Sequence, residues 1–197
     1  MAGIARIEGR AIPFGRANVD TDLIIPAAHL KTVSRLGLGR YAFEPLRREP
    51  GNVFDQPEFS GAPILIAGAN FGCGSSREHA VWALCDLGIR AVIAPSFSDI
   101  FAANAFRNGL VTVELPPEAI DRLLSVAGQG RFSVDLEAME VLSAHGDRFA
   151  FALDPFRRDS LMKADDEIGF TLTHEAEISA HEAGSAFRFQ AMASPSA

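Results

Sequence analysis

The chain has 197 residues, of which 48% are hydrophobic and 22% are charged, which is typical of one globular domain with a full hydrophobic core. Its formal net charge is −7, from 18 Lys and Arg against 25 Asp and Glu, and this balance argues against a phosphate-binding nucleic-acid interface. The apolar stretches are too short to cross a bilayer, and the N-terminal residues lack the pattern of a secretion signal. We therefore expect a cytoplasmic protein that binds neither nucleic acid nor membrane.

The first third of the chain shows short and irregular patterns. Residues 4–14 alternate apolar and polar side chains around Gly9, as an edge strand or a hairpin would. A polar turn at residues 18–22 follows, and then a short apolar run that Pro26 ends. Residues 35–61 are rich in Gly, Pro, Arg and Glu, so we expect a long irregular segment that a few aromatic side chains anchor. Long loops in compact domains often carry function.

From Pro63 onward, predicted strands and helices alternate. The expected strands are residues 64–67, 91–94 and 110–115, and the expected helices are residues 77–87, 98–106 and a helix that starts at Pro116. Short apolar strands that are joined by helices are typical of a parallel sheet. Three further short strands are expected at residues 132–136, 138–143 and 149–153. The sequence thus predicts an α/β fold with a mainly parallel sheet and a smaller antiparallel part.

The C-terminal region has weaker patterns. We expect a turn or short helix to open at residues 154–156, a helix-to-strand transition at residues 165–172 and a polar helix at residues 173–182. The predicted domain organisation is one domain over residues 1–182 and a flexible tail over residues 183–197.

The glycine-rich segment at residues 72–79, Gly-Cys-Gly-Ser-Ser-Arg-Glu-His, carries the strongest functional signal. It stands between a predicted strand and a predicted helix, where the backbone N–H groups of a tight turn and of a first helical turn can bind an anion. Arg77 beside the hydroxyls of Ser75 and Ser76 suits bidentate binding of a carboxylate. The segment would also lie at the carboxyl end of a parallel strand, where α/β sheets usually bind ligands. We therefore predict an anionic substrate.

Structural interpretations of this segment remain open. Glycine-rich turns are common in α/β proteins, and serine is a routine helix N-cap. The spacing is not that of a dinucleotide-binding turn, a P-loop or a hydrolase nucleophile elbow. Glu78 and His79 could be an acid and a base, or simply a first-turn acid and a packed imidazole.

The two cysteines, Cys73 and Cys85, limit the cofactors that this chain can hold. A disulfide framework needs more cysteines, and an iron–sulfur cluster needs three or four ligands, so neither can be formed by this chain alone. Cys73 is expected to be a small residue in a tight turn and Cys85 to lie on the apolar face of its helix.

Several segments in this order together resemble a known family. They are residues 18–26 (NVDTDLIIP), 70–80 (NFGCGSSREHA), 94–101 (APSFSDIF), 134–137 (VDLE) and 156–158 (FRR). They resemble the small subunits of bacterial 3-isopropylmalate dehydratase, in the aconitase superfamily, over about residues 3–182. The resemblance implies a swivelling β/β/α three-layer domain that docks on a large subunit bearing a [4Fe-4S] cluster. It implies no cofactor and no metal bound by this chain alone.

The reaction of that family is the conversion of 2-isopropylmalate to 3-isopropylmalate through 2-isopropylmaleate, by dehydration and rehydration, in leucine biosynthesis. The resemblance implies that Ser75 is the base that removes the carbon-bound proton and that Arg77 binds a carboxylate of this small dicarboxylate substrate. Ser76 is then a second hydroxyl or a helix cap. Asp22 would orient catalytic or substrate groups, with an Asx-turn or N-cap as the alternative. A serine is a poor base at neutral pH, so Ser75 needs N–H donors, Arg77 and the exclusion of water.

The loop after Pro26 is expected to set substrate preference in such a protein. Its candidate substrate contacts are His29, Leu30, Lys31 and Val33. Leu30 and Val33 favour an apolar side group, whereas Lys31 and Arg35 leave open a third carboxylate, as in a homoaconitase, or the substrate of a citraconate hydratase.

Two other classes of function remain alternatives. One is an enzyme that acts without a partner, with Cys73 or Ser75 as nucleophile and His79 as base. The other is an RNA-binding regulatory module, against which the acidic composition argues.

Overall fold

The computed structural model describes residues 3–31, 34–163, 171–172 and 174–183. The chain divides into two units, Met1–Ala164 and Asp165–Ala197. The predicted domain limit at residue 182 stays a prediction, since much of the second unit lies outside the described residues. Within the described residues, the structure has no helix that is long and apolar enough to span a membrane.

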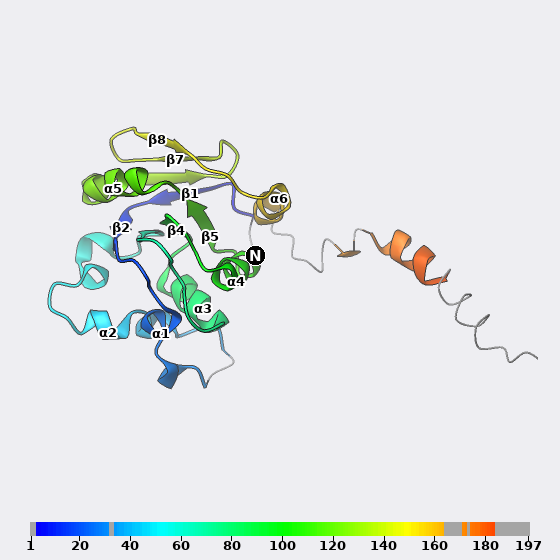
Figure 1. Cartoon of the computed structure of the whole chain (residues 1–197), viewed down its shortest axis with the longest axis horizontal. Coiled ribbons are helices and arrows are strands. Elements are labelled where there is room, and N and C mark those ends of the chain that lie inside the picture. The colour runs from blue at the N-terminus through cyan, green and yellow to red at the C-terminus, as the bar shows by residue number, and fades with distance from the viewer. Residues whose placement is uncertain (1–2, 32–33, 164–170, 173, 184–197) are drawn as a thin grey trace, which may run out of the picture. The chain divides into compact units, whose positions relative to one another are not determined.

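Two four-stranded sheets form the centre of the first unit (Figure 1). The parallel sheet has the order β2-β3-β4-β5 and the antiparallel sheet the order β1-β6-β7-β8. The strands are β1 (Arg6–Gly9), β2 (Ala11–Pro13), β3 (Ile64–Ile66), β4 (Ala91–Ala94), β5 (Val111–Glu114), β6 (Phe132–Asp135), β7 (Glu140–Leu142) and β8 (Arg148–Ala150). The predicted α/β class with a parallel and an antiparallel part is confirmed.

The N-terminal segment forms two edge strands in different sheets, so the hairpin alternative for residues 4–14 is wrong. β1 pairs antiparallel with β6, whereas β2 pairs parallel with β3. The chain passes from one sheet to the other at Gly9 and Arg10. A side chain at Gly9 would not fit, because its Cβ would lie 2.3 Å from Cδ of Pro63. This crossover explains why the alternation of residues 4–14 extends over two strands that are not paired with each other.

The helices of the first unit are α1 (Thr21–Ile24), α2 (Glu44–Arg47), α3 (Glu78–Leu87), α4 (Asp99–Arg107), α5 (Pro117–Val126) and α6 (Pro155–Lys163), with 3-10 turns η1 (Ala27–His29), η2 (Gly39–Tyr41), η3 (Val53–Asp55), η4 (Pro57–Phe59) and η5 (Ala127–Gln129). Of these helices, α3, α4 and the start of α5 lie close to the predicted residues, α6 extends the expected short helix, and α1 and α2 are short helices that the sequence did not predict. Ser98 caps α4 by accepting a hydrogen bond from the Phe101 N–H at 3.2 Å. Gly88 ends α3 with a φ of 106°.

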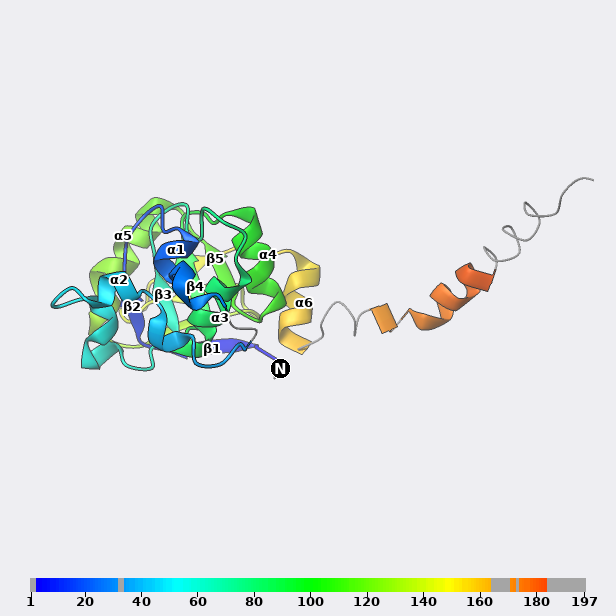
Figure 2. The same ribbon diagram turned by 90° about the horizontal axis from the view of Figure 1, so that it is seen from below.

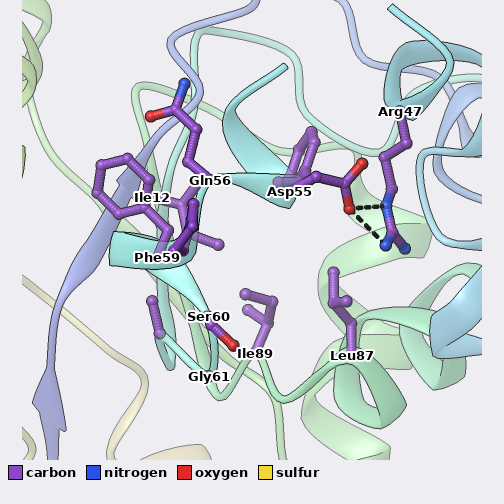
Figure 3. A pocket seen from close by; sticks show the side chains of 12 residues that line it. Ile12, Arg47, Asp55, Gln56, Phe59, Ser60, Gly61, Leu87 and Ile89 are labelled. Carbon is purple, nitrogen blue, oxygen red and sulfur yellow. Dashed lines mark hydrogen bonds and ion pairs between the residues drawn. The ribbon is translucent and has the colours of Figure 1, made fainter. Parts of the chain in front are cut away.

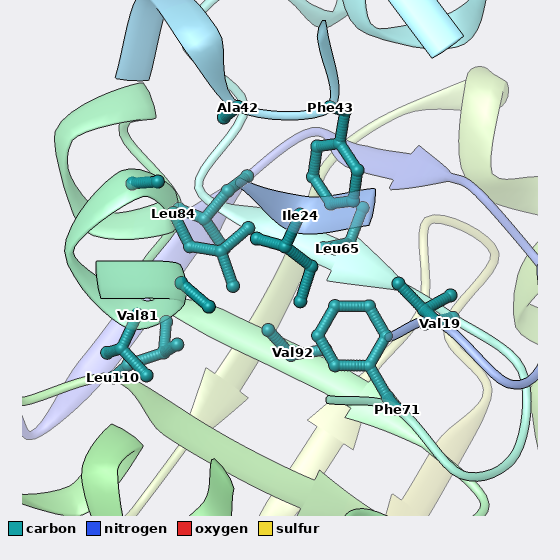
Figure 4. Packing of buried hydrophobic residues seen from close by; sticks show 14 of the residues in the cluster. Val19, Ile24, Ala42, Phe43, Leu65, Phe71, Val81, Leu84, Val92 and Leu110 are labelled. Carbon is teal, nitrogen blue, oxygen red and sulfur yellow. The ribbon is translucent and has the colours of Figure 1, made fainter. Parts of the chain in front are cut away.

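The parallel sheet is buried on both faces, as its continuous apolar strands predict. Side chains such as Leu65 and Val92 pack against α1, α3 and the loops around Phe43, in the cluster that Figure 4 shows. Side chains such as Ile64 and Ile93 pack on the other face against the antiparallel sheet and α5. Full burial of one such side chain stabilises the fold by about 1.5–3 kcal/mol. Figure 2 shows α1 in front of the parallel strands, with α3 and α4 beside it.

Residues 35–61 are largely irregular, as predicted, and contain only short helical turns. Phe43 is fully buried and stacks on Phe54, with ring centroids 4.1 Å apart. Phe59 is buried as well. The predicted aromatic anchors therefore fix this segment to the core.

In the second unit, residues 175–183 are helical, in agreement with the predicted polar helix at residues 173–182. Residues 171–172 are helical, so the strand end of the predicted helix-to-strand transition is wrong there; residues 165–170, which carry the rest of it, lie outside the described residues. The tail from residue 184 lies outside them too.

Candidate functional site

Three loops meet at the carboxyl edge of the parallel sheet, after β2, β3 and β4. The first two run side by side: the Asn18 N–H donates to the Ala69 carbonyl at 2.8 Å, and the Gly72 N–H donates to the Val19 carbonyl at 2.8 Å. Asn18 and Asn70 both have a positive φ, 53° and 59°, which asparagine tolerates better than most residues. The side-chain amide of Asn70 donates to that of Asn18 at 2.9 Å. Residues far apart in sequence are thus fixed next to each other.

The loop after β4 holds the glycine turn from the other side. The Ser98 hydroxyl donates to the Gly72 carbonyl at 2.8 Å, and the Ser96 hydroxyl accepts from the Asn70 N–H at 2.9 Å. Gly72 has a φ of 74°, and a Cβ there would lie 2.2 Å from Cγ of Phe101. Only glycine fits both this conformation and this close contact.

An ion pair joins the first two loops at the centre of this edge. Nη1 of Arg77 donates to Oδ1 of Asp22, which lies on α1. The Arg77 side chain is 25% exposed and that of Asp22 is 53% exposed. The N-cap of α1 is Asp20, whose Oδ1 accepts from the Leu23 N–H at 2.7 Å, so the N-cap alternative for Asp22 is wrong. Asp22 instead holds the guanidinium in place.

Ser75 and Ser76 lie exposed between this ion pair and the start of α3. The Ser75 carbonyl accepts hydrogen bonds from the Arg77 N–H at 2.8 Å and from Oγ1 of Thr21 at 3.1 Å. The main chain of Ser75 is therefore fixed while its side chain reaches solvent. Arg77 is the N-cap of α3 and no side chain caps this helix, so the cap alternative for Ser76 is wrong.

The other candidates in the glycine-rich segment have structural contacts. Oε1 of Glu78 accepts from the Asn108 side-chain amide at 2.8 Å. The ring of His79 packs on Trp82, with ring centroids 4.6 Å apart. Burial raises the pKa of the Cys85 thiol, as expected for a core cysteine. These contacts favour the structural interpretations of Glu78, His79 and Cys85.

The predicted substrate loop begins at η1, after Pro26. Nε2 of His29 lies 2.7 Å from Oε2 of Glu44, and its ring stacks on Tyr41 with centroids 3.7 Å apart. Leu30 is half-buried and packs against the core, whereas Lys31 is exposed. Val33 lies outside the described residues.

Cavities in the described part of the chain lie beside or away from this edge. One of about 400 Å³ is lined by His29 and Lys31 of the substrate loop and by Tyr41 of η2. Another, of about 340 Å³, lies near the opposite ends of the parallel strands (Figure 3). There Arg47 donates to Oδ1 of Asp55 through Nε at 2.8 Å and through Nη2 at 2.6 Å. The charge of Arg47 is thereby neutralised within the protein.

Sequence reasoning missed two residues that hold the site, Thr21 and Ser98. Both are small hydroxyl residues whose side chains donate to carbonyls of the glycine turn. Their signal was weak because a hydroxyl residue at the start of a helix is an ordinary cap. Among the described residues, no group of three or more His, Cys, Asp or Glu side chains could hold a metal ion.

Comparison with known proteins gives consistent matches. Residues 1–118 match the sequence model of the aconitase C-terminal domain. The chain is 62% identical over 183 residues to the 3-isopropylmalate dehydratase small subunit of Novosphingobium aromaticivorans, covering 93% of this chain and 91% of that one. It is 56% identical over 182 residues to the protein of the same name from Zymomonas mobilis, covering 92% and 95%.

A solved structure has the same fold. It is the crystal structure of a 3-isopropylmalate dehydratase from Methanocaldococcus jannaschii, which matches with a TM-score of 0.69 and 28% sequence identity, over 89% of this chain and 99% of that chain.

Proposed function

The chain belongs to the family of 3-isopropylmalate dehydratase small subunits, within the aconitase superfamily, and we propose that it forms one half of the active site of that hydro-lyase. The reaction is the loss of water from 2-isopropylmalate to give 2-isopropylmaleate, and the return of water with the opposite regiochemistry to give 3-isopropylmalate. This isomerisation belongs to leucine biosynthesis.

The observation that carries the proposal is the Asp22–Arg77 ion pair beside the exposed Ser75. A guanidinium has five N–H donors, and Asp22 takes only one edge of it, so donors remain for a substrate carboxylate. The carboxylate of Asp22 also restrains the guanidinium through Nη1 before substrate binds, which lowers the entropic cost of binding. Arg77 is thus a binding residue and Asp22 its positioning residue.

Ser75 is the proposed catalytic base. Its hydroxyl is exposed at the edge where substrate would bind, and its main chain is fixed through the Ser75 carbonyl. It takes the carbon-bound proton in the dehydration and returns a proton in the hydration. A serine can do this only where positive charge and N–H donors stabilise its alkoxide and where water is excluded. Arg77 supplies the charge, and we propose that a docked partner excludes the water.

The partner is the large subunit of the enzyme, and we propose that it carries the [4Fe-4S] cluster. This chain does not fit such a cluster, because it has two cysteines and a cluster takes three or four such ligands. The half of the chemistry that removes the hydroxyl therefore belongs to the partner. The contribution of this chain is to bind carboxylate, to move the proton and to close the site.

The preferred substrate carries an apolar side group. The named relatives of this chain are 3-isopropylmalate dehydratase subunits, which favours this substrate over those of homoaconitase or citraconate hydratase. Leu30, at the start of the loop, is apolar and half-buried, and an apolar pocket distinguishes substrates by about 1–3 kcal/mol per methylene.

The test is reconstitution. The purified chain is mixed anaerobically with a cluster-loaded large subunit, and formation of the unsaturated intermediate is followed by its absorbance with 2-isopropylmalate, homocitrate and citramalate. We expect turnover only with both subunits and fastest with 2-isopropylmalate. Turnover by this chain alone would refute the proposal, as would a clear preference for homocitrate.

Ser75→Ala and Ser76→Ala form a matched pair for the assignment of the base. Both serines are exposed neighbours, so either change should leave stability within about 0.5 kcal/mol of the parent. We expect Ser75→Ala to lower kcat by several orders of magnitude, because it removes the group that transfers the proton. We expect Ser76→Ala to lower kcat by less than about tenfold, because it removes only a hydrogen bond. Equal losses in the two variants would remove Ser75 from the role of base.

A further inference from the structure

We infer that His29 is a positioning residue that fastens the start of the substrate loop to α2 and Tyr41, and that it does not itself contact substrate. The inference rests on the proposed function, because it concerns the loop that is expected to set substrate preference. It replaces the expectation that His29 is a substrate contact.

Two contacts hold the imidazole of His29. Its Nε2 lies 2.7 Å from Oε2 of Glu44, within the range of a strong hydrogen bond. Its ring lies parallel to the ring of Tyr41, with an angle of 10° between the planes and 3.7 Å between the centroids. Only 21% of the side chain is exposed. To bond to a substrate, Nε2 would have to leave Glu44, although the ring also lines the cavity of about 400 Å³ beside the loop.

The carboxylate of Glu44 is oriented and kept ionised by its neighbours. Its other oxygen, Oε1, accepts from Nη2 of Arg48 at 2.6 Å. The hydrogen bond from His29, and secondarily the one from Arg48, lowers the pKa of the Glu44 carboxyl below its usual range. Glu44 therefore stays ionised at neutral pH, and its bond with His29 is charge-assisted.

The main chain at this point has little stability of its own. The turn η1 is three residues long and is closed by the His29 N–H to the Pro26 carbonyl at 3.0 Å and by the Leu30 N–H to the Ala27 carbonyl at 3.2 Å. So short a 3-10 turn depends on tertiary contacts. The side chain of His29 supplies two of them, Leu30 packs against the core, and Lys31 follows directly. The His29 contacts therefore help to set the geometry of the backbone that carries Leu30 and Lys31.

The experiment separates the two contacts of His29. His29→Phe keeps a ring that can stack on Tyr41 and removes the donor to Glu44, whereas His29→Gln keeps a donor and removes the ring. Glu44→Gln removes the charge that receives the bond. Arg48→Gln is the matched control, because Arg48 contacts Glu44 through the other oxygen and is 75% exposed. Circular dichroism verifies that each variant is folded.

The first readout is hydrogen exchange of the His29 and Leu30 amides in the full chain, which needs no catalysis. We expect exchange about tenfold faster in His29→Phe and in Glu44→Gln, no further increase in the double variant, partial rescue in His29→Gln and no change in Arg48→Gln. Unchanged exchange in His29→Phe, or additive effects in the double variant, would overturn the inference.

The second readout uses the enzyme reconstituted with its large subunit. We expect His29→Phe and Glu44→Gln to raise KM for 2-isopropylmalate by the same factor, about threefold to tenfold, with kcat within about twofold of the parent. A raised KM in His29→Phe together with a parental KM in Glu44→Gln would show direct substrate contact and would overturn the inference. Failure of the parental pair to turn over would refute the proposed function alone, since the exchange readout stands independently.

Discussion

Thr21 offers a direct test of how the catalytic edge is held together. It is 2% exposed, and its Oγ1 donates to the Ser75 carbonyl at 3.1 Å. Thr21→Val keeps the shape of the side chain and removes this donor. The Ser75 carbonyl still accepts from the Arg77 N–H at 2.8 Å, so it is not left without a partner. The expected loss of stability is therefore the net value of one hydrogen bond, about 1 kcal/mol.

The expected effect on rate follows from the same bond. This hydrogen bond holds the main chain of Ser75 in its catalytic position with a free energy of about 1 kcal/mol. If Ser75 must occupy that position in the transition state, loss of the bond raises the activation free energy by the same amount, and kcat falls by about fivefold. Thr21→Ser is the matched control, because it keeps the hydroxyl and removes a buried methyl group. That deletion also costs about 1 kcal/mol of stability. The two variants should thus be similarly destabilised and differ in rate.

The assay combines thermal unfolding of the purified chain with single-turnover kinetics of the reconstituted enzyme. For a chain of this size, about 1 kcal/mol corresponds to a fall in Tm of roughly 2–4 °C. We expect this shift in both variants and a lower kcat only in Thr21→Val. An unchanged kcat in Thr21→Val, or an equal loss in both variants, would refute the claim that this hydrogen bond positions Ser75.

Two further predictions concern stability. Gly72→Ala would place a Cβ 2.2 Å from Cγ of the buried Phe101 ring, at a φ of 74°. We therefore expect the free energy of unfolding, measured in urea, to fall by about 3 kcal/mol. A urea midpoint equal to that of the parent would contradict the close contact. The pKa of the Asp147 carboxyl is lowered, first by the hydrogen bond from Ser143 and second by the one from Arg122. A carboxyl whose pKa is lower in the folded state stabilises the fold at every pH above its unfolded-state pKa of about 4. This stabilisation is lost as the pH falls through the folded-state pKa. Asp147→Asn should therefore unfold at a lower temperature than the parent at neutral pH and at a similar one at about pH 2, and parallel curves across this range would exclude the contribution.

The elements that could be predicted from sequence are those with strong local signals. The strands at Ile64 and Ala91 are continuous apolar runs, and α3 and α4 end at glycine and asparagine signals that their backbones use. The irregular segment with aromatic anchors was predictable from its glycines and prolines. The exposed position of Ser75 followed from a glycine turn at the carboxyl end of a strand.

The rest depends on long-range contacts that local patterns do not encode. The alternation of residues 4–14 fits a hairpin as well as two strands that belong to different sheets, and only the partners of β1 and β2 decide between them. Similarly, Asp20 and Asp22 flank the same threonine, and either could cap α1. In the structure Asp20 caps α1, whereas Asp22 pairs with Arg77 across 55 positions of sequence. The contacts of His29 were hidden for the same reason.

The crossover at Gly9 has a consequence for the order in which a ribosome-bound chain can assemble. The strands of the parallel sheet all lie within the first 114 residues, whereas β1 pairs with β6, where Arg6 lies opposite Asp135. During translation, the edge with Ser75 and Arg77 can therefore form before the N-terminal strand has a mate. Until β6 emerges, β1 presents unsatisfied main-chain groups that a chaperone or a second nascent chain could capture.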